Sequence, residues 1–152
     1  MSRRNQIAMT AEELSAFLED QRVVICATNG PRGWPHLMPL WYVMRDGEVW
    51  AWTYAKSQKV RNLERDARAT LQVEAGDSYD QLRGVMLETE VEIDRDVERV
   101  GALGMKLTER YAGTLTPEAR EAVTAQARKR VALRFIAQHT ATWDHRKLAG
   151  TY

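Results

Sequence analysis

The sequence is 152 residues long, enough for one domain with a buried core and too short for two. It is 44% hydrophobic and 28% charged, and its net charge of +1 gives no overall field that would favour nucleic acid or an anionic membrane. No apolar stretch approaches the roughly 20 residues that a membrane span needs, and no apolar signal core follows the basic start. The single cysteine, Cys26, cannot form an internal disulfide, and its apolar neighbours favour a buried, inert thiol. We therefore expect one cytoplasmic domain over residues 1–152, with no nucleic-acid or membrane partner.

The first expected elements are a short helix and an apolar strand. Thr10 and Glu13 have the spacing of a capping box, in which each side chain bonds the backbone amide of the other. An apolar stripe at helical spacing follows and consists of Leu14, Phe17 and Leu18. Residues 23–28 then predict a strand, which the turn cluster at 29–33 ends.

The stretch 35–44 is apolar on both faces of the strand that it predicts. One face carries Leu37, Trp41 and Val43, and the other carries Met38, Leu40, Tyr42 and Met44. One face can line a barrel interior, so the other must meet a second dry surface, such as a partner subunit or a flat aromatic ligand. A hairpin turn at Asp46-Gly47 leads to a return strand over 48–54, whose aromatic face consists of Trp50, Trp52 and Tyr54.

The rest of the chain alternates between helices and strands. The helix that begins at Thr116-Pro117 is polar almost all round, so we expect it to pack loosely on the outside. About six strands joined by hairpins, with helices inserted at the edges, predict a mainly β (α+β) antiparallel barrel with peripheral helices. The remaining expected elements are a helix over 57–65, strands over 69–73 and 85–94, a helix over 97–111 and a last strand over 131–137.

The segment 53–62 is the candidate site, because it runs from the end of a strand into the start of a helix. Free amides and the positive end of the helix dipole make such a place a cradle for an anion. Thr53 and Ser57 add hydroxyl donors, and Lys56 and Lys59 add charged donors. Cations at a helix N-terminus oppose the dipole at about 0.3–1 kcal/mol each, unless an anion compensates. The pattern alone leaves two interpretations open, a phosphate site and a solvated basic surface, because no Gly-rich loop accompanies it.

Other groups of polar side chains give weaker signals. The three histidines, His36, His139 and His145, have no metal-ligand spacing, so no metal site is predicted. Asp144 and His145 are neighbours on a strand and point to opposite faces, which separates them as an acid–base pair. Trp143 fits either a core plug or a lid over a ring. No nucleophile is flanked by a base, so no catalytic side chain is named; a solvated strand face is predicted for Glu88, Glu90 and Glu92.

The segments GWPHLMPLWY (33–42) and KSQKVRNLERD (56–66) resemble the pyridoxamine 5'-phosphate oxidase-like flavin split-barrel superfamily. Within it, the similarity is greatest to the actinobacterial flavin/deazaflavin oxidoreductases, branch B, which bind coenzyme F420 or FMN. The segments 76–79, 82–85 and 143–148 fit the same pattern, so the likeness covers about residues 10–148. The resemblance implies a six-stranded antiparallel split β-barrel and a homodimer with two sites at its interface.

The resemblance also assigns roles by position. Lys59 would hold the cofactor phosphate with Thr53, Ser57 and Lys56, and Asn62 would brace the turn. The backbone of residues 38–40 would border the ring system, and residues 78–79 would approach from the other subunit. The cofactor-binding residues implied in this way are His36, Met38, Pro39, Leu40, Thr53, Lys56, Ser57, Lys59, Asn62, Ser78 and Tyr79.

The leading functional hypothesis is a coenzyme F420-dependent oxidoreductase that delivers a hydride to an unsaturated small molecule. The cofactor carries such chemistry, which agrees with the missing acid–base pair. F420 has a long anionic tail, which Arg61 and Arg65 would favour. The alternatives are an FMN-dependent oxidase or reductase and a non-catalytic cofactor-binding or carrier protein; haem binding by His36 or His145 is not expected.

Two departures from the family pattern bear on these hypotheses. Some relatives carry arginine where Ser57 stands, so the phosphate grip would depend more on Lys56. The chain ends in LAGTY (148–152), without the arginine-leucine-proline-type ending that binds substrate in the true pyridoxine-phosphate oxidases. Oxidation of vitamin B6 is therefore not expected.

Overall fold

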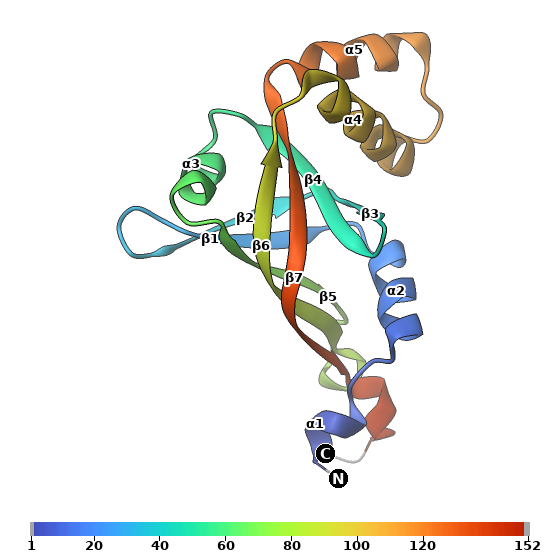
Figure 1. The fold of residues 1–152 in the computed structure, drawn as a ribbon. Helices are drawn as coiled ribbons and strands as arrows, with labels where there is room; N and C mark the ends of the chain where they lie inside the picture. The colour runs from blue at the N-terminus through green and yellow to red at the C-terminus, as the bar shows by residue number, and fades with distance from the viewer. Residues whose placement is uncertain (1, 151–152) are drawn as a thin grey trace.

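The computed structural model describes residues 2–150 and shows one curled antiparallel sheet with helices around it (Figure 1). The strand order is β2-β1-β5-β6-β7-β4-β3, and every pair is antiparallel. The half-barrel confirms the predicted split-barrel α+β class. The strands are β1 (Val24–Asn29), β2 (Pro35–Leu40), β3 (Val43–Arg45), β4 (Glu48–Tyr54), β5 (Arg68–Ala75), β6 (Arg83–Asp94) and β7 (Arg130–Asp144).

The helices lie at the edges of this sheet. α4 and α5 form a pair at one end, and the described ends of the chain meet at the other end (Figure 1). No helix within residues 2–150 is long and apolar enough to cross a membrane. The α-helices are α1 (Arg3–Gln6), α2 (Ala11–Asp20), α3 (Gln58–Arg65), α4 (Val97–Ala112) and α5 (Pro117–Ala127), and two short 3-10 helices are η1 (Tyr79–Gln81) and η2 (His145–Leu148).

The sheet has seven strands among the described residues rather than the predicted six. The expected strand over 35–44 breaks at Trp41 and Tyr42, between β2 and β3. Side chains of α4 bond the backbone there: the Tyr111 hydroxyl accepts from the Tyr42 nitrogen at 2.9 Å, and Arg110 donates to the Tyr42 carbonyl at 2.9 Å. The Trp41 ring stacks on the Tyr111 ring at 4.3 Å. Because α4 supplies these partners, the backbone can leave the ladder without burying unsatisfied groups.

Two apolar cores lie on opposite faces of β4. Its inward residues Val49 and Ala51 join the main core inside the curl of the sheet. Its outward residues Trp50 and Trp52 pack under α4, in a second cluster that includes Val100, Leu103 and Leu107. A methyl group added to Gly104 of α4 would overlap the ring of Trp52, so this glycine sets how closely the helix approaches the sheet.

Two predictions for the second half of the chain were wrong: where the last strand ends and how tightly α5 packs. β7 does not end near residue 137 but continues to Asp144, because it pairs with β6 along nearly its whole length. α5 is not loosely attached, since Val123 and Ala127 are buried and the helix packs against α4. Only a few apolar side chains on one face of α5 are needed for this contact, which its polar sequence conceals.

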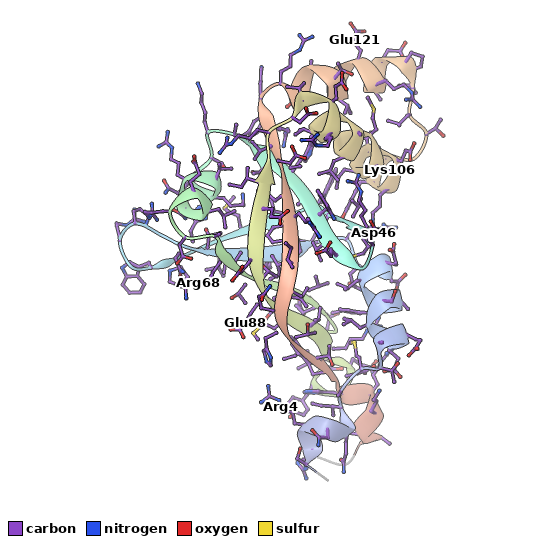
Figure 2. All side chains as sticks on the ribbon, in the orientation of Figure 1. Arg4, Asp46, Arg68, Glu88, Lys106 and Glu121 are labelled. Carbon is purple, nitrogen blue, oxygen red and sulfur yellow. The ribbon has the colours of Figure 1, made fainter. Side chains whose placement is uncertain are left out.

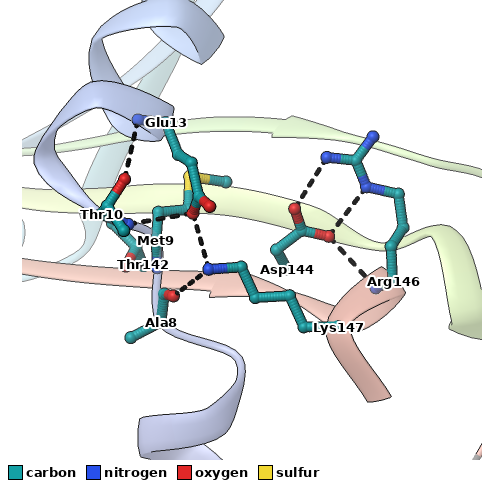
Figure 3. Close-up of polar contacts among 8 residues, drawn as sticks. All are labelled: Ala8, Met9, Thr10, Glu13, Thr142, Asp144, Arg146 and Lys147. Atoms are coloured by element: carbon teal, nitrogen blue, oxygen red, sulfur yellow. Dashed lines mark hydrogen bonds and ion pairs between the residues drawn. The ribbon is translucent and has the colours of Figure 1, made fainter. Parts of the chain in front are cut away.

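The N-terminal segment and the end of β7 are held together by a set of polar contacts (Figure 3). Lys147 donates to the backbone oxygen of Ala8 at 2.7 Å and pairs with Glu13 at 2.6 Å. Glu13 also completes the predicted capping box with Thr10. In η2, Arg146 pairs with the buried Asp144 at 2.7 Å. These bonds fix the position of the tail that follows Trp143.

Candidate functional site

The candidate site begins at the junction of β4 and α3. The strand ends at Tyr54, and the Ser57 hydroxyl caps α3 by accepting from the Val60 nitrogen at 3.3 Å. The Ala55 nitrogen donates to the Lys129 backbone oxygen at 2.9 Å, which joins this turn to the start of β7. The predicted strand-to-helix turn is therefore present, and it is fixed from both sides.

Lys59 points inward from the first turn of α3 and is 4% exposed. Its Nζ donates to the Thr53 hydroxyl at 3.3 Å, so the structure brings these two predicted residues together. Burial lowers the pKa of the Lys59 ammonium, and it raises the pKa of the neighbouring Cys26 thiol to about 11. An ammonium has three protons to donate, and one neutral hydroxyl satisfies only part of that capacity. The arrangement suits an additional anionic acceptor.

Asn62 is fully buried one turn further along α3. Its Nδ2 donates to the Thr28 hydroxyl at 3.0 Å, which ties α3 to β1. Its Oδ1 accepts from Gln58 at 2.7 Å and from Arg65 at 3.2 Å. Arg65 also donates to the Asn29 backbone oxygen at 3.0 Å. In this structure its guanidinium therefore bonds the end of β1 and not the anionic tail of a cofactor.

The predicted residues of β2 lie beside this junction. In the β1–β2 register, His36 stands opposite Thr28 and Met38 opposite Cys26. Directly paired residues share a face of the sheet, so both side chains are on the α3 side of β2. His36 Nδ1 is buried and has no hydrogen-bond partner among the described residues. Pro39 and Leu40 complete the predicted stretch, and β2 is an edge strand of the sheet.

Ser78 and Tyr79 are not brought to Lys59 within one chain. They lie at η1, near the described chain ends, whereas α3 lies beside the β1–β2 hairpin (Figure 1). The Ser78 hydroxyl bonds Asp80 at 2.6 Å, and the Tyr79 ring lies 4.6 Å from the His145 ring. Trp143 lies over Gly84, where an added methyl group would overlap its ring, so here it packs on the sheet.

A hollow of about 630 Å³ opens on the outer side of the 54–57 turn. Two cationic residues that sequence reasoning missed, Arg128 and Lys129, share it with the predicted Lys56 and Ser57. The basic run 128–130 before the last strand was the available signal, but only tertiary contact brings it to Lys56. The full lining consists of Tyr54, Ala55, Lys56, Ser57, Arg128 and Lys129.

A larger hollow, of about 700 Å³, lies on the face of β1, β5 and β6, and its lining includes Thr28, the partner of Asn62. It contains none of the predicted site residues. Arg68 at its edge is already paired with Asp66 at 2.8 Å. Glu88, which Figure 2 labels, and Glu90 are exposed as predicted. Within the described part of the chain, no three acidic, histidine or cysteine side chains gather as a metal site would require. We therefore place the candidate site at the β4–α3 junction, because its side chains can bind an anion, although the hollow on β1, β5 and β6 is larger.

Comparison with known proteins agrees with this architecture. A family model described as pyridoxamine 5'-phosphate oxidase matches residues 10–145. The conserved hypothetical protein Rv2991 of Mycobacterium tuberculosis is 42% identical with a TM-score of 0.91, over 100% of this chain and 95% of that chain. A structure named F420 reductase is 25% identical with a TM-score of 0.69, over 87% of this chain and 98% of that chain.

A more distant neighbour shows the fold alone. The heme storage protein HutZ of Vibrio cholerae is 15% identical with a TM-score of 0.68, over 87% of this chain and 94% of that chain. Among proteins of curated function, none matches the sequence. The family model spans most of the chain, and Rv2991 shares the half-barrel along the chain's whole length. This protein therefore belongs to the pyridoxamine 5'-phosphate oxidase family of flavin split-barrel proteins.

Proposed function

We propose that the protein is an oxidoreductase that uses coenzyme F420, with its phosphate held at Lys59. The buried ammonium of Lys59 carries this proposal. At 4% exposure it has one neutral acceptor, Thr53, and no carboxylate partner among the described residues. A buried charge without a counter-ion is unfavourable, and a phosphate oxygen would supply both the opposite charge and further acceptors.

The remaining residues of the junction support a fixed anion site. Asn62 and Ser57 hold α3 in place through Thr28 and the Val60 nitrogen, so the start of the helix does not depend on the ligand for its shape. The unpartnered Nδ1 of His36 lies on the neighbouring strand β2 and offers a polar contact to a ring system. Such a site binds and orients a cofactor and leaves the redox chemistry to it.

The chemistry that a bound reduced deazaflavin supplies is transfer of a hydride to an unsaturated acceptor, which gains a proton from water. The chain contributes binding of the phosphate, an apolar strand against the ring, and exclusion of water by the exposed apolar residues of β2 once they are covered. Leu37 and Met38 are 58% and 44% exposed in one chain. A homodimer would cover them and would bring Ser78 and Tyr79 of the second chain to the site.

F420 is preferred to FMN because a relative named F420 reductase is 25% identical over nearly its whole length. The alternatives are an FMN-dependent enzyme of the same fold and a non-catalytic cofactor carrier. Titration of the purified protein with F420 and with FMN, followed by tryptophan fluorescence, tests the choice. Micromolar or tighter binding of F420 with weaker binding of FMN is expected. The opposite preference would move the protein to the FMN group, and binding of neither would refute the cofactor role.

Turnover separates an enzyme from a carrier. The protein loaded with reduced cofactor is offered a panel of conjugated and unsaturated small molecules, and oxidation of the cofactor is followed by absorbance. Oxidation that depends on the acceptor is expected. Tight binding without turnover across the panel would favour the carrier.

A further inference from the structure

We infer that His145, in the C-terminal tail of residues 144–148, is the proton donor to the substrate of the proposed reaction. The acceptor takes a hydride from the reduced cofactor and a proton that comes from water, and His145 delivers that proton through Nε2. This inference rests on the proposed function, including the approach of Ser78 and Tyr79 from the second chain. It gives a role to the tail, which the phosphate site leaves without one.

The hydrogen bond of the imidazole is the first argument. His145 Nδ1 lies 2.8 Å from the backbone oxygen of Tyr79, and a carbonyl oxygen can only accept a hydrogen bond. Nδ1 therefore carries a proton in the neutral ring as well as in the charged ring. No group within residues 2–150 bonds Nε2. The proton that the ring gains and loses is then the one on Nε2.

The rigid attachment of the tail is the second argument. No residue of η2 is buried, so this segment adds nothing to an apolar core. It is nevertheless held at several points: the His145 nitrogen donates to the Leu82 backbone oxygen at 2.9 Å, and Arg146 bonds the Asp144 carboxylate at 2.7 Å. Lys147 bonds the segment before α2 (Figure 3). These contacts fix the imidazole in one place, which a proton donor requires.

The charged side chains that flank His145 have partners of their own. Asp80 accepts from the Ser78 hydroxyl at 2.6 Å, and Asp144 is held by Arg146. Neither carboxylate therefore competes with a substrate for Nε2. The titratable or charged groups on η1, at the start of β6 and along the tail are Tyr79, Asp80, Arg83, Asp144, Arg146 and Lys147.

The position of η1 and the tail is the third argument. In one chain they lie near the described chain ends, away from α3 (Figure 1). Each of these places carries an exposed apolar side chain: Tyr79 is 61% exposed on η1, and Leu37 is 58% exposed on β2. In a twofold dimer the surface at one end of each chain can cover the surface at the other end of its partner. His145 then enters the second chain's site together with Tyr79.

The acceptor that suits such a donor is an α,β-unsaturated carbonyl compound. Hydride adds to its β-carbon, and the electrons of the carbon–carbon double bond move toward the carbonyl oxygen. The bond between Nε2 and its proton breaks as the proton passes to the α-carbon. The double bond gains two electrons, which come from the reduced cofactor. The neutral imidazole regains its proton from water, while Nδ1 continues to donate to the Tyr79 oxygen.

The variant His145→Asn tests the donor on the full-length protein. Its amide can keep the bond to the Tyr79 oxygen and has no group at the position of Nε2. We expect unchanged affinity for F420 by tryptophan fluorescence and a turnover that falls about a hundredfold to ten-thousandfold. Wild-type turnover should fall as the pH rises and the imidazolium loses its proton, and the variant should lack that dependence. The control His139→Asn, at an exposed position of β7, should match wild type.

Mixed dimers test whether His145 acts in the site of the other chain. Lys59→Met and His145→Asn are co-expressed and assayed at a concentration of F420 that Lys59→Met binds poorly. One site of a mixed dimer then combines an intact Lys59 of one chain with an intact His145 of the other. Turnover should recover to about a quarter of wild type, because about half of the dimers are mixed and each has one intact site. No recovery would overturn the placement of His145.

Nitrogen NMR of the cofactor-free protein gives a measurement that does not depend on turnover. The neutral ring of His145 should carry its proton on Nδ1, and Nε2 should be the nitrogen that changes on titration. The opposite tautomer would overturn the inference. Full turnover by His145→Asn would reject His145 as the donor and keep the proposed function, whereas binding of neither F420 nor FMN to wild type would reject both.

Discussion

The hydroxyl of Tyr111 in α4 accepts a hydrogen bond from the backbone nitrogen of Tyr42 at 2.9 Å, in the break between β2 and β3. The same hydroxyl lies 2.7 Å from the Arg22 carbonyl and 2.9 Å from the Tyr42 carbonyl. One side chain of α4 thus supplies the hydrogen bonds that a neighbouring strand would otherwise make with the backbone at Tyr42. This contact decides where the apolar edge strand β2 ends.

Replacing Tyr111 with phenylalanine should leave the Tyr42 amide without its partner while keeping the stack on Trp41. We expect the free energy of unfolding to fall by about 1–3 kcal/mol, the usual effect of orphaning a buried donor. Urea unfolding measures it. Tyr54→Phe is the control, because that exposed ring keeps its contact with Arg130, and it should stay within about 0.5 kcal/mol of wild type. Equal stability of the two variants would show that the hydroxyl does not hold the break.

Two glycines of α4 should respond oppositely to alanine. A methyl group at Gly104 would overlap Trp52, so Gly104→Ala should destabilise the protein by about 1–3 kcal/mol. At Gly101 the new methyl would lie 3.6 Å from the Ala127 Cβ, an ordinary contact. Gly101→Ala should therefore stabilise the helix by up to about 1 kcal/mol. Thermal unfolding compares the two, and a stabilising Gly104→Ala would contradict the close packing of α4 on β4.

Lys59→Met should separate binding from stability. The variant keeps the stem of the side chain and removes an ammonium that is buried with one neutral acceptor. We expect cofactor affinity to fall about tenfold to a hundredfold, while the melting temperature stays equal or rises. Fluorescence titration and thermal unfolding give the two values.

Lys106→Met serves as the matched control for Lys59→Met, since Lys106 is exposed on α4. It should change neither affinity nor stability. An unchanged dissociation constant for Lys59→Met would remove Lys59 from the phosphate site.

The buried thiol of Cys26 predicts a loss of stability at alkaline pH. Burial raises its pKa from 9.0 to about 11, so over this range the folded chain holds a proton that the unfolded chain has released. The free energy of unfolding then falls as pH rises, by about 2–3 kcal/mol in total for this group. The raised pKa of Tyr42, to about 12, acts in the same direction at higher pH, and the lowered pKa of Lys59 acts in the opposite direction.

The variant Cys26→Ala isolates this contribution. Urea unfolding of both proteins from about pH 8 to about pH 11 should show a steeper fall for wild type than for the variant. Parallel curves would mean that the thiol does not couple folding to pH.

The exposed edge strand predicts a homodimer. Leu37 is 58% exposed on β2, and Leu37→Glu should place a charge in the interface and convert a dimer into a monomer. Light scattering after size-exclusion chromatography measures the mass. Ala122→Glu adds the same charge on the exposed part of α5 and should leave the mass unchanged. A monomeric wild-type protein would exclude the shared site.

Local sequence patterns determined several helix ends and turns of this protein. The capping box at Thr10 and Glu13, the hairpin at Asp46-Gly47 and the strand-to-helix turn capped by Ser57 depend on neighbours a few residues apart, and all are present. The alternation along β5 and β6 likewise gave the inward face of the barrel, because side chains of a strand alternate between its two faces.

Contacts between distant segments were decided only by the tertiary structure. The sequence pattern of the apolar stretch 35–44 predicts one strand. In the structure the strand is interrupted because Tyr111 and Arg110 bond the backbone of Tyr42. No local pattern connects Arg128 and Lys129 with Lys56; the bond from the Ala55 nitrogen to the Lys129 backbone oxygen sets them beside it. Periodicity reports which face of an element is apolar, but not which remote side chain meets it. That partner depends on how the sheet curls and where α4 and α5 pack.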